Sequence, residues 1–217
     1  GDPDLGCQGD PVRIIRALRF AAKLQFTIEE NTWRYMEVHR DKLALASQRG
    51  LLDEMWKTLH GGSAAQTIPL MYDSGVLSMI LPELDTQMSD EAGQQLLLKS
   101  MDLLDMFHAH PLMSPAVSTP LFFQELLEPL WQPDQIRGNE VQQLVHDVLN
   151  PRLVEYGYSR FQRDQIQRVL MIMTYLGHPK YPRQRVATRI RRRDQFKTAR
   201  FAWNLLWFAR GELDRLG

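Results

Sequence analysis

Residues 9–26 read GDPVRIIRALRFAAKLQF, and this stretch predicts the fold class of the chain. Asp10 followed by Pro11 is typical of a helix start, because aspartate caps the first backbone amides and proline fits the first helical position. We expect this helix to end at about residue 24. At 100° per residue its apolar side chains fall in one arc. Four cations share a second arc nearly opposite the apolar one: Arg13, Arg16, Arg19 and Lys23.

The basic arc has two interpretations. Arginine offers planar, permanently charged donors that suit phosphates and the edges of nucleic-acid bases. A helix face that is simply solvated has the same composition. The sequence pattern alone therefore leaves ligand binding and solvation both open.

Composition places the chain among ordinary globular proteins. Its 217 residues carry a formal net charge of zero, and 44% are hydrophobic while 24% are charged. Cys7 is the single cysteine and cannot form an internal disulfide, so we expect a reducing compartment and a cytoplasmic location. No apolar run reaches the roughly 18 residues that span a bilayer, and we expect neither a signal peptide nor a membrane partner.

The neutral total conceals a basic C-terminal segment. Between Arg183 and Arg200, eight basic residues stand against Asp194 alone. A chain with such segregated charge can present a basic surface to a polyanion. The segment also holds aromatic residues that suit base stacking, although their spacing equally fits a buried core face. These are Phe196, Phe201, Trp203, Trp207 and Phe208.

Helical periodicity dominates the whole chain, and no run alternates as a strand does, so we predict an all-α fold built as an irregular multi-helix array. For the second helix we expect Thr27 as the cap, with Glu30 completing a capping box. Ser47 should cap the third, and Gly75 should follow the fourth. The helices expected after the first cover residues 30–46, 48–59, 64–73, a short run before Pro82, 90–107, 120–130, 139–149, 160–176 and 183–209.

The motif search indicates no self-contained catalytic site. His108 and His110, with acidic residues upstream, suggest a metal site, but a third and fourth ligand at a recognised spacing are missing. We therefore expect structural or exposed histidines and no metal. The pair His146 and Asp147 lacks the partners that a phosphohydrolase would need. Phosphate-loop, GxSxG, HExxH and CxxC patterns are absent from the sequence.

The opening stretch, extended as DPVRIIRALRFAAKLQFTI, resembles the neck of the class II nucleotidyltransferases that build RNA 3′ ends. These are poly(A) polymerases and tRNA CCA-adding enzymes, whose usual form is EDPxRxLRAxRFAxKLxF. Weaker similarity continues through residues 51–84. Two later stretches resemble the poly(A) polymerase branch, SPAVSTPLFFQELLEPLW at 114–131 and RIRRRDQFKTARFAWNLL at 189–206.

The resemblance implies a neck domain over residues 1–85 that binds RNA and nucleotide, followed over 86–217 by a helical body with a basic C-terminal segment. In that family a head with paired aspartates precedes the neck and binds two Mg²⁺ ions. We expect the head to be absent from this chain, which alone should be inactive. The implied function is the RNA-binding and nucleotide-selecting part of a poly(A) polymerase that adds AMP from ATP to RNA 3′ ends. The alternatives are the same region of a tRNA CCA-adding enzyme, or a non-catalytic helical RNA-binding module.

The resemblance also implies site residues. Asp10 and Arg13 match the aspartate and arginine of the family's EDxxR motif, which reads the incoming base, and Arg16 lies one turn further. Gly9 stands where the family has glutamate. The intact enzyme is expected to use Mg²⁺ and ATP and to bind an RNA 3′ end. The cations expected to contact RNA are Arg19, Lys23, Arg189, Arg191, Arg192, Arg193, Lys197 and Arg200.

Overall fold

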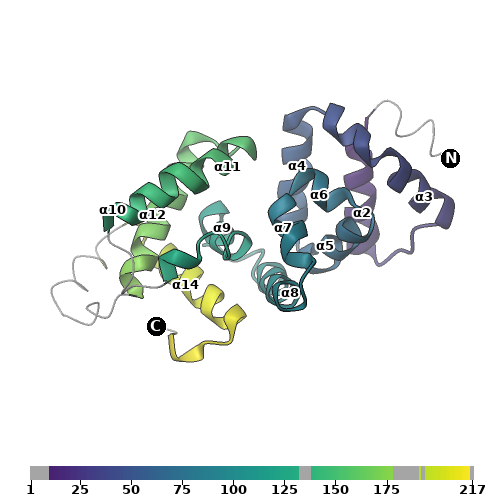
Figure 1. Ribbon diagram of the computed structural model, residues 1–217. Helices are drawn as coiled ribbons and strands as arrows, with labels where there is room; N and C mark the ends of the chain where they lie inside the picture. The colour runs from purple at the N-terminus through teal and green to yellow at the C-terminus, as the bar shows by residue number, and fades with distance from the viewer. Residues whose placement is uncertain (1–9, 132–137, 178–190, 192–193, 216–217) are drawn as a thin grey trace. The chain divides into compact units, whose positions relative to one another are not determined.

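The computed structural model describes residues 10–131, 138–177, 191 and 194–215, and every regular element in these ranges is a helix (Figure 1). The predicted all-α class is therefore confirmed. The chain divides into two compact units, Gly1–His108 and Ala109–Gly217. The functional division expected at residue 85 stays a prediction. Across the described ranges, none of the helices is long and apolar enough to cross a membrane.

The first unit is organised around one central helix, α5, which packs against α2, α4, α6 and α8. Its side chains Ile68 and Met71 are fully buried, as are Ile15 and Leu18 on the facing side of α2. In chain order the elements are α2 (Val12–Leu24), α3 (Glu30–His39), the 3-10 helix η1 (Arg40–Leu45), α4 (Gln48–His60), α5 (Ala64–Asp73), α6 (Val76–Ile80), α7 (Pro82–Met88) and α8 (Glu91–Met106).

Helix starts in the first unit follow the sequence signals except at α3 and at α7, a helix that was not predicted although Pro82 suits its first turn. The Ser47 hydroxyl caps α4 as predicted, accepting a hydrogen bond from the amide of Gly50 at 3.2 Å. The capping box predicted for Thr27 and Glu30 is wrong. Instead the Glu29 carboxylate accepts from the amide of Thr32 at 3.0 Å, so α3 begins immediately after it. The helix also ends at His39, where the chain tightens into η1.

A carboxylate from another helix caps α5. Asp105 of α8 accepts hydrogen bonds from the amides of Ala64 at 2.8 Å and Ala65 at 2.9 Å. Burial of this carboxyl raises its pKa, and the two amide hydrogen bonds only partly offset that effect. Asp105 therefore ties α8 to the start of the central helix, in place of the local cap that Ser63 does not provide.

The second unit has a core in which α9, α12 and α14 pack against one another. Leu121 and Phe122 of α9, Ile166 and Leu170 of α12, and Trp207 of α14 are each at most 2% exposed. Its elements are α9 (Pro115–Phe122), η2 (Glu128–Trp131), α10 (Gly138–Leu144), the π-helical turn η3 (Val145–Leu149), α11 (Asn150–Glu155), α12 (Arg160–Leu176), α14 (Phe196–Arg210) and η4 (Leu213–Arg215).

Two helices of this unit differ from the prediction. The helix expected over 120–130 is instead α9, which begins at Pro115 because proline is well suited to a first helical turn. The chain continues only as the short η2, in which Pro129 cannot donate an amide hydrogen bond. The helix expected over 139–149 continues through η3 into α11. The helix expected over 160–176 is confirmed, whereas that over 183–209 lies partly outside the described residues.

Candidate nucleic-acid interface

Asp10 caps α2 from its N-terminal end. Its carboxylate Oδ1 accepts a hydrogen bond from the amide of Val12 at 3.1 Å, and its carbonyl accepts from the amide of Arg13 at the same distance. A carboxylate has about four lone-pair sites, so capping leaves Asp10 able to accept from a ligand amine as well. Capping and base recognition are therefore compatible roles for this residue.

The two faces of α2 follow the helical wheel except at one position. Ile14, Ile15 and Leu18 are at most 1% exposed. On the opposite side Arg13 and Lys23 are exposed, and the Arg16 side chain is 43% exposed. Arg19 is the exception, because it shares the basic arc yet only 8% of it is exposed.

Glu54 of α4 explains why Arg19 is buried. This carboxylate is 2% exposed and accepts hydrogen bonds from Arg19 Nε at 3.2 Å and Nη2 at 3.0 Å. Its other oxygen accepts from Arg16 Nε at 3.2 Å and from Lys57 Nζ at 3.0 Å. Burial acts to raise the pKa of Glu54, but the hydrogen bonds from Lys57 and Arg19 outweigh it and hold the pKa below its ordinary value.

These four residues form the Glu54 cluster: Arg16, Arg19, Glu54 and Lys57. Three cations around one carboxylate leave the cluster a surplus of two positive charges. The contact also fixes the guanidinium of Arg16 while nearly half of its side chain stays open to solvent. A cation that is already oriented loses less conformational entropy when it binds a phosphate. The cluster is therefore suited to hold an anionic ligand at the surface of α2.

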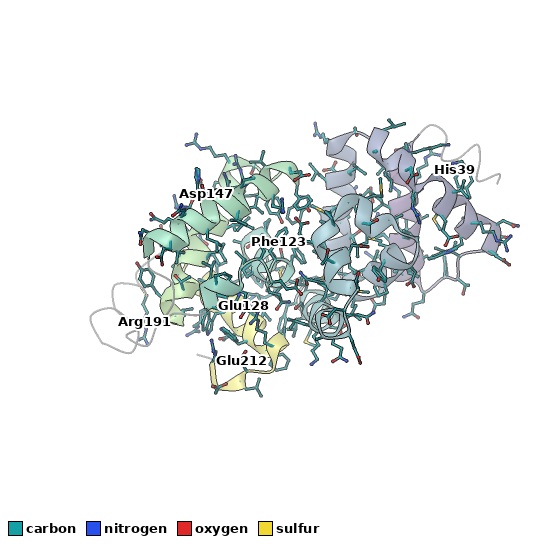
Figure 2. The ribbon with its side chains drawn as sticks, in the orientation of Figure 1. His39, Phe123, Glu128, Asp147, Arg191 and Glu212 are labelled. Carbon is teal, nitrogen blue, oxygen red and sulfur yellow. The ribbon has the colours of Figure 1, made fainter. Side chains whose placement is uncertain are left out.

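The basic C-terminal segment is described only in part. Arg189, Arg192 and Arg193 lie outside the described residues. Arg191 is exposed, as Figure 2 shows for its labelled side chain, and Lys197 and Arg200 on α14 are exposed as well. Three predicted RNA contacts in the second unit are thus accessible to a ligand, and their role stays a prediction.

The aromatic residues of α14 mostly form core. Trp203 and Trp207 are 4% and 1% exposed, and their rings pack edge to face with centroids 5.2 Å apart. The Trp203 indole donates to the carbonyl of Arg215 at 2.7 Å. The core interpretation is wrong for Phe208, which is 56% exposed. The two tryptophans are therefore not available as stacking platforms for bases.

The histidine motifs have local partners. His108 Nδ1 lies 2.7 Å from the carbonyl of Asp105, and the His110 ring stacks on Phe201 with centroids 4.3 Å apart. His146 and Asp147 are exposed and contact each other through Nδ1 and Oδ1 at 2.7 Å. In the part of the chain that the structure describes, no three His, Cys, Asp or Glu side chains gather as metal ligands.

Sequence reasoning missed Glu54, although a signal for it exists. On α4 the residue lies beside Met55 and one turn before Thr58, both of which are buried. A carboxylate within a buried helix face must find cationic partners, because an unpaired buried charge is very costly. The basic arc of α2 is the source of two such partners, and Lys57 on α4 is the third.

A family model matches residues 25–88, which begin immediately after α2 and include Glu54 and Lys57. Its description is "Probable RNA and SrmB- binding site of polymerase A". The matched region therefore supplies the carboxylate that holds two arginines of the preceding helix.

Three curated relatives belong to two kinds of nucleotidyltransferase. Poly(A) polymerase I of Haemophilus influenzae is 28% identical over 127 residues, which are 57% of this chain and 28% of the relative. The Multifunctional CCA protein of Neisseria gonorrhoeae is 38% identical over 79 residues, which are 35% of this chain and 19% of the relative. The CCA-adding enzyme of Geobacillus thermodenitrificans is 34% identical over 84 residues, 39% of this chain and 20% of the relative.

The matches thus span less than a third of each relative's length. They confirm the predicted resemblance over part of the chain. By sequence, the chain is similar in part to poly(A) polymerases and CCA-adding enzymes.

Proposed function

We propose that this chain is the RNA-binding and nucleotide-selecting part of a poly(A) polymerase that adds AMP from ATP to RNA 3′ ends. The observation that carries the proposal is the match of residues 25–88 to an RNA-binding family model, in a unit whose α2 presents Arg16, a partly exposed cation held by Glu54. The two-metal chemistry of phosphoryl transfer, with its Mg²⁺ ions, belongs in this proposal to a part of the protein outside these 217 residues. The chain alone then binds its ligands without catalysing the transfer.

Nucleotide selection is assigned to the N-terminal end of α2. The Asp10 carboxylate accepts from the exocyclic amine of adenine, and the exposed Arg13 guanidinium donates to a ring nitrogen of the same base. Arg16, held by Glu54, lies one turn further and faces the triphosphate. Asp10 carries this role while it caps the helix, because its carboxylate accepts more than one hydrogen bond.

RNA binding is assigned to the remaining cations. The exposed cations contact phosphates in this proposal: Lys23, Arg191, Lys197 and Arg200. The same role is assigned by sequence to Arg189, Arg192 and Arg193, which lie outside the described residues. Arg19 has a different role from the predicted one. Its guanidinium is paired with Glu54 and only 8% of the residue is exposed, so it supports the basic surface from beneath rather than touching RNA.

CCA addition to tRNA is the second candidate function. It is favoured by the higher sequence identity of the CCA-adding relatives, 38% and 34%, against 28% for the poly(A) polymerase. The poly(A) assignment is favoured by the longer match of that relative, 127 residues against 79 and 84. The two functions differ in one observable property, which is the use of CTP.

The test uses the natural protein that contains this chain. It is incubated with ATP alone, with CTP alone and with both, on an unstructured RNA and on a tRNA that lacks its 3′ CCA end. Poly(A) polymerase activity predicts long products on the unstructured RNA with ATP alone. Addition of only three nucleotides to the tRNA, dependent on CTP, would assign the second function. Absence of any transfer on either RNA would leave a non-catalytic RNA-binding module.

A further inference from the structure

The exposed side of α2 carries aromatic and aliphatic side chains as well as cations. Phe20 is 44% exposed, Leu24 is 52% exposed, and Phe26, just beyond the helix, is 67% exposed. At 100° per residue Phe20 and Leu24 share the arc of Arg13. We call this surface the α2 face and define it by Arg13, Arg16, Phe20, Lys23 and Leu24, together with the exposed Phe26 that follows the helix by two residues.

Phe20 is oriented by the Glu54 cluster. The Arg19 guanidinium lies over the Phe20 ring at 4.4 Å from its centroid, and two hydrogen bonds from Arg19 to Glu54 fix that guanidinium. A cation over an aromatic ring is attracted by the electron-rich face of the ring. The partly exposed ring is therefore held from beneath instead of rotating freely, which lowers the entropic cost of stacking a ligand on it.

We infer that the α2 face is a stacking surface for single-stranded RNA, on which Phe20 and Phe26 each receive a base while Lys23 contacts the backbone phosphate. This inference rests on the proposed function and names the form of RNA that the chain takes. Aromatic platforms interleaved with cations are the pattern by which proteins hold unpaired strands. Bases within a duplex are stacked on one another, so their faces are closed to such platforms.

The order of residues along α2 fits the chemistry of chain extension. Asp10 and Arg13, assigned to the incoming nucleotide, lie at the N-terminal end of the helix, and Phe20 lies two turns further, about 10 Å along the axis. That spacing places the last bases of the RNA beside the nucleotide to be added. The α2 face thus holds the 3′ end next to the nucleotide site.

The test measures binding of an unstructured RNA that carries the fluorescent base 2-aminopurine near its 3′ end. Stacking on an aromatic ring quenches this base, so quenching reports the contact itself. Phe20→Leu and Phe26→Leu keep an apolar side chain but remove the ring, and each should weaken binding roughly tenfold and reduce the quenching. Phe20→Tyr keeps an aromatic ring and should therefore keep both the wild-type affinity and the wild-type quenching. Phe161→Leu, at a 72% exposed position in the second unit, is the matched control and should change neither.

The same RNA annealed to its complement should bind the wild-type chain more weakly and should not respond to the leucine variants. The inference is overturned if both leucine variants bind the RNA as tightly as the wild type does and quench 2-aminopurine to the same extent. The proposed function itself is overturned if the wild-type chain binds no RNA at low salt. Circular dichroism of each variant establishes that the helices are intact. A protein ligand on this face would leave RNA affinity unchanged in all variants, which also overturns the inference.

Discussion

Replacing Glu54 with glutamine should strongly destabilise the first unit. The substitution keeps the side-chain volume but leaves the buried Arg19 guanidinium without its counter-charge. Arg16 and Lys57 lose the same partner, yet their side chains are 43% and 55% exposed, so water can solvate them. Removing one member of a buried ion pair costs about 3 to 5 kcal/mol, and we expect about 3 kcal/mol here because glutamine still accepts one hydrogen bond.

For a unit of about 100 residues this loss lowers the melting temperature by on the order of 12 °C or more. The assay is urea unfolding followed by helical circular dichroism at pH 7. Glu30→Gln is the control, because Glu30 and its partner Arg34 have side chains 75% and 70% exposed, and an exposed pair contributes less than about 1 kcal/mol. The double variant Arg19→Met and Glu54→Met should recover most of the loss, since it leaves no buried charge unpaired.

Protonation of Glu54 in acid removes the stability that its ionised carboxylate contributes. The folded-state pKa of Glu54 lies below its ordinary value of 4.5, so the ionised carboxylate contributes stability above pH 4.5. That contribution is lost as the pH falls through the folded-state pKa. The gap between wild type and Glu54→Gln should therefore be complete at pH 7 and close in acid. A glutamine variant as stable as wild type at pH 7, or a double variant no more stable than the single one, would refute the reasoning.

Three further predictions concern stability. Asp105→Ala should lower the free energy of unfolding, measured in urea, by about 1 kcal/mol, because two amides at the start of α5 lose their cap. An unchanged unfolding midpoint would show that water replaces the carboxylate. Burial lowers the pKa of His60 from 6.5 to about 4, so the unfolded chain binds more protons between those values and stability falls by about 3 kcal/mol as the pH drops. His60→Asn should remove this fall in stability with pH, whereas His146→Asn should keep it. Equal pH dependence in the two variants would contradict the assignment of the effect to His60. Gly177→Ala places a Cβ 2.6 Å from the Trp203 ring and should lower the free energy of unfolding by about 1 to 3 kcal/mol. The tryptophan emission should change as well, because the ring must shift. Unchanged emission and stability would mean that the ring moves freely.

Local signals in the sequence predicted much of the first unit. The start and end of α2, the Ser47 cap of α4 and the glycine after α5 depend on residues within a few positions of each other, and all are found in the structure. The error at Thr27 is also local. Glutamate is a weaker cap by preference, yet Glu29 reaches the amide of Thr32 and so determines where α3 begins.

The candidate site needed contacts that sequence spacing cannot supply. The helical wheel placed Arg19 in the same exposed basic arc as Arg16, because it takes no account of what packs against the helix. Glu54, 35 residues further along the chain, separates the two by burying one guanidinium and leaving the other partly exposed. Packing likewise decided the aromatic residues of α14, where Trp207 is in the core and Phe208 is exposed.

The measurement that tests the central claim most directly is the salt dependence of RNA affinity. The logarithm of the binding constant of the chain for an unstructured RNA should fall linearly with the logarithm of the salt concentration, by about 0.7 per phosphate contacted. The triple variant Arg191→Gln, Lys197→Gln and Arg200→Gln should reduce that slope by about 2. The charge-matched control is the triple variant of the exposed residues Arg152, Arg160 and Arg168, which should keep the wild-type slope. Wild-type affinity that does not change with salt, or equal slopes in the two triple variants, would contradict the account.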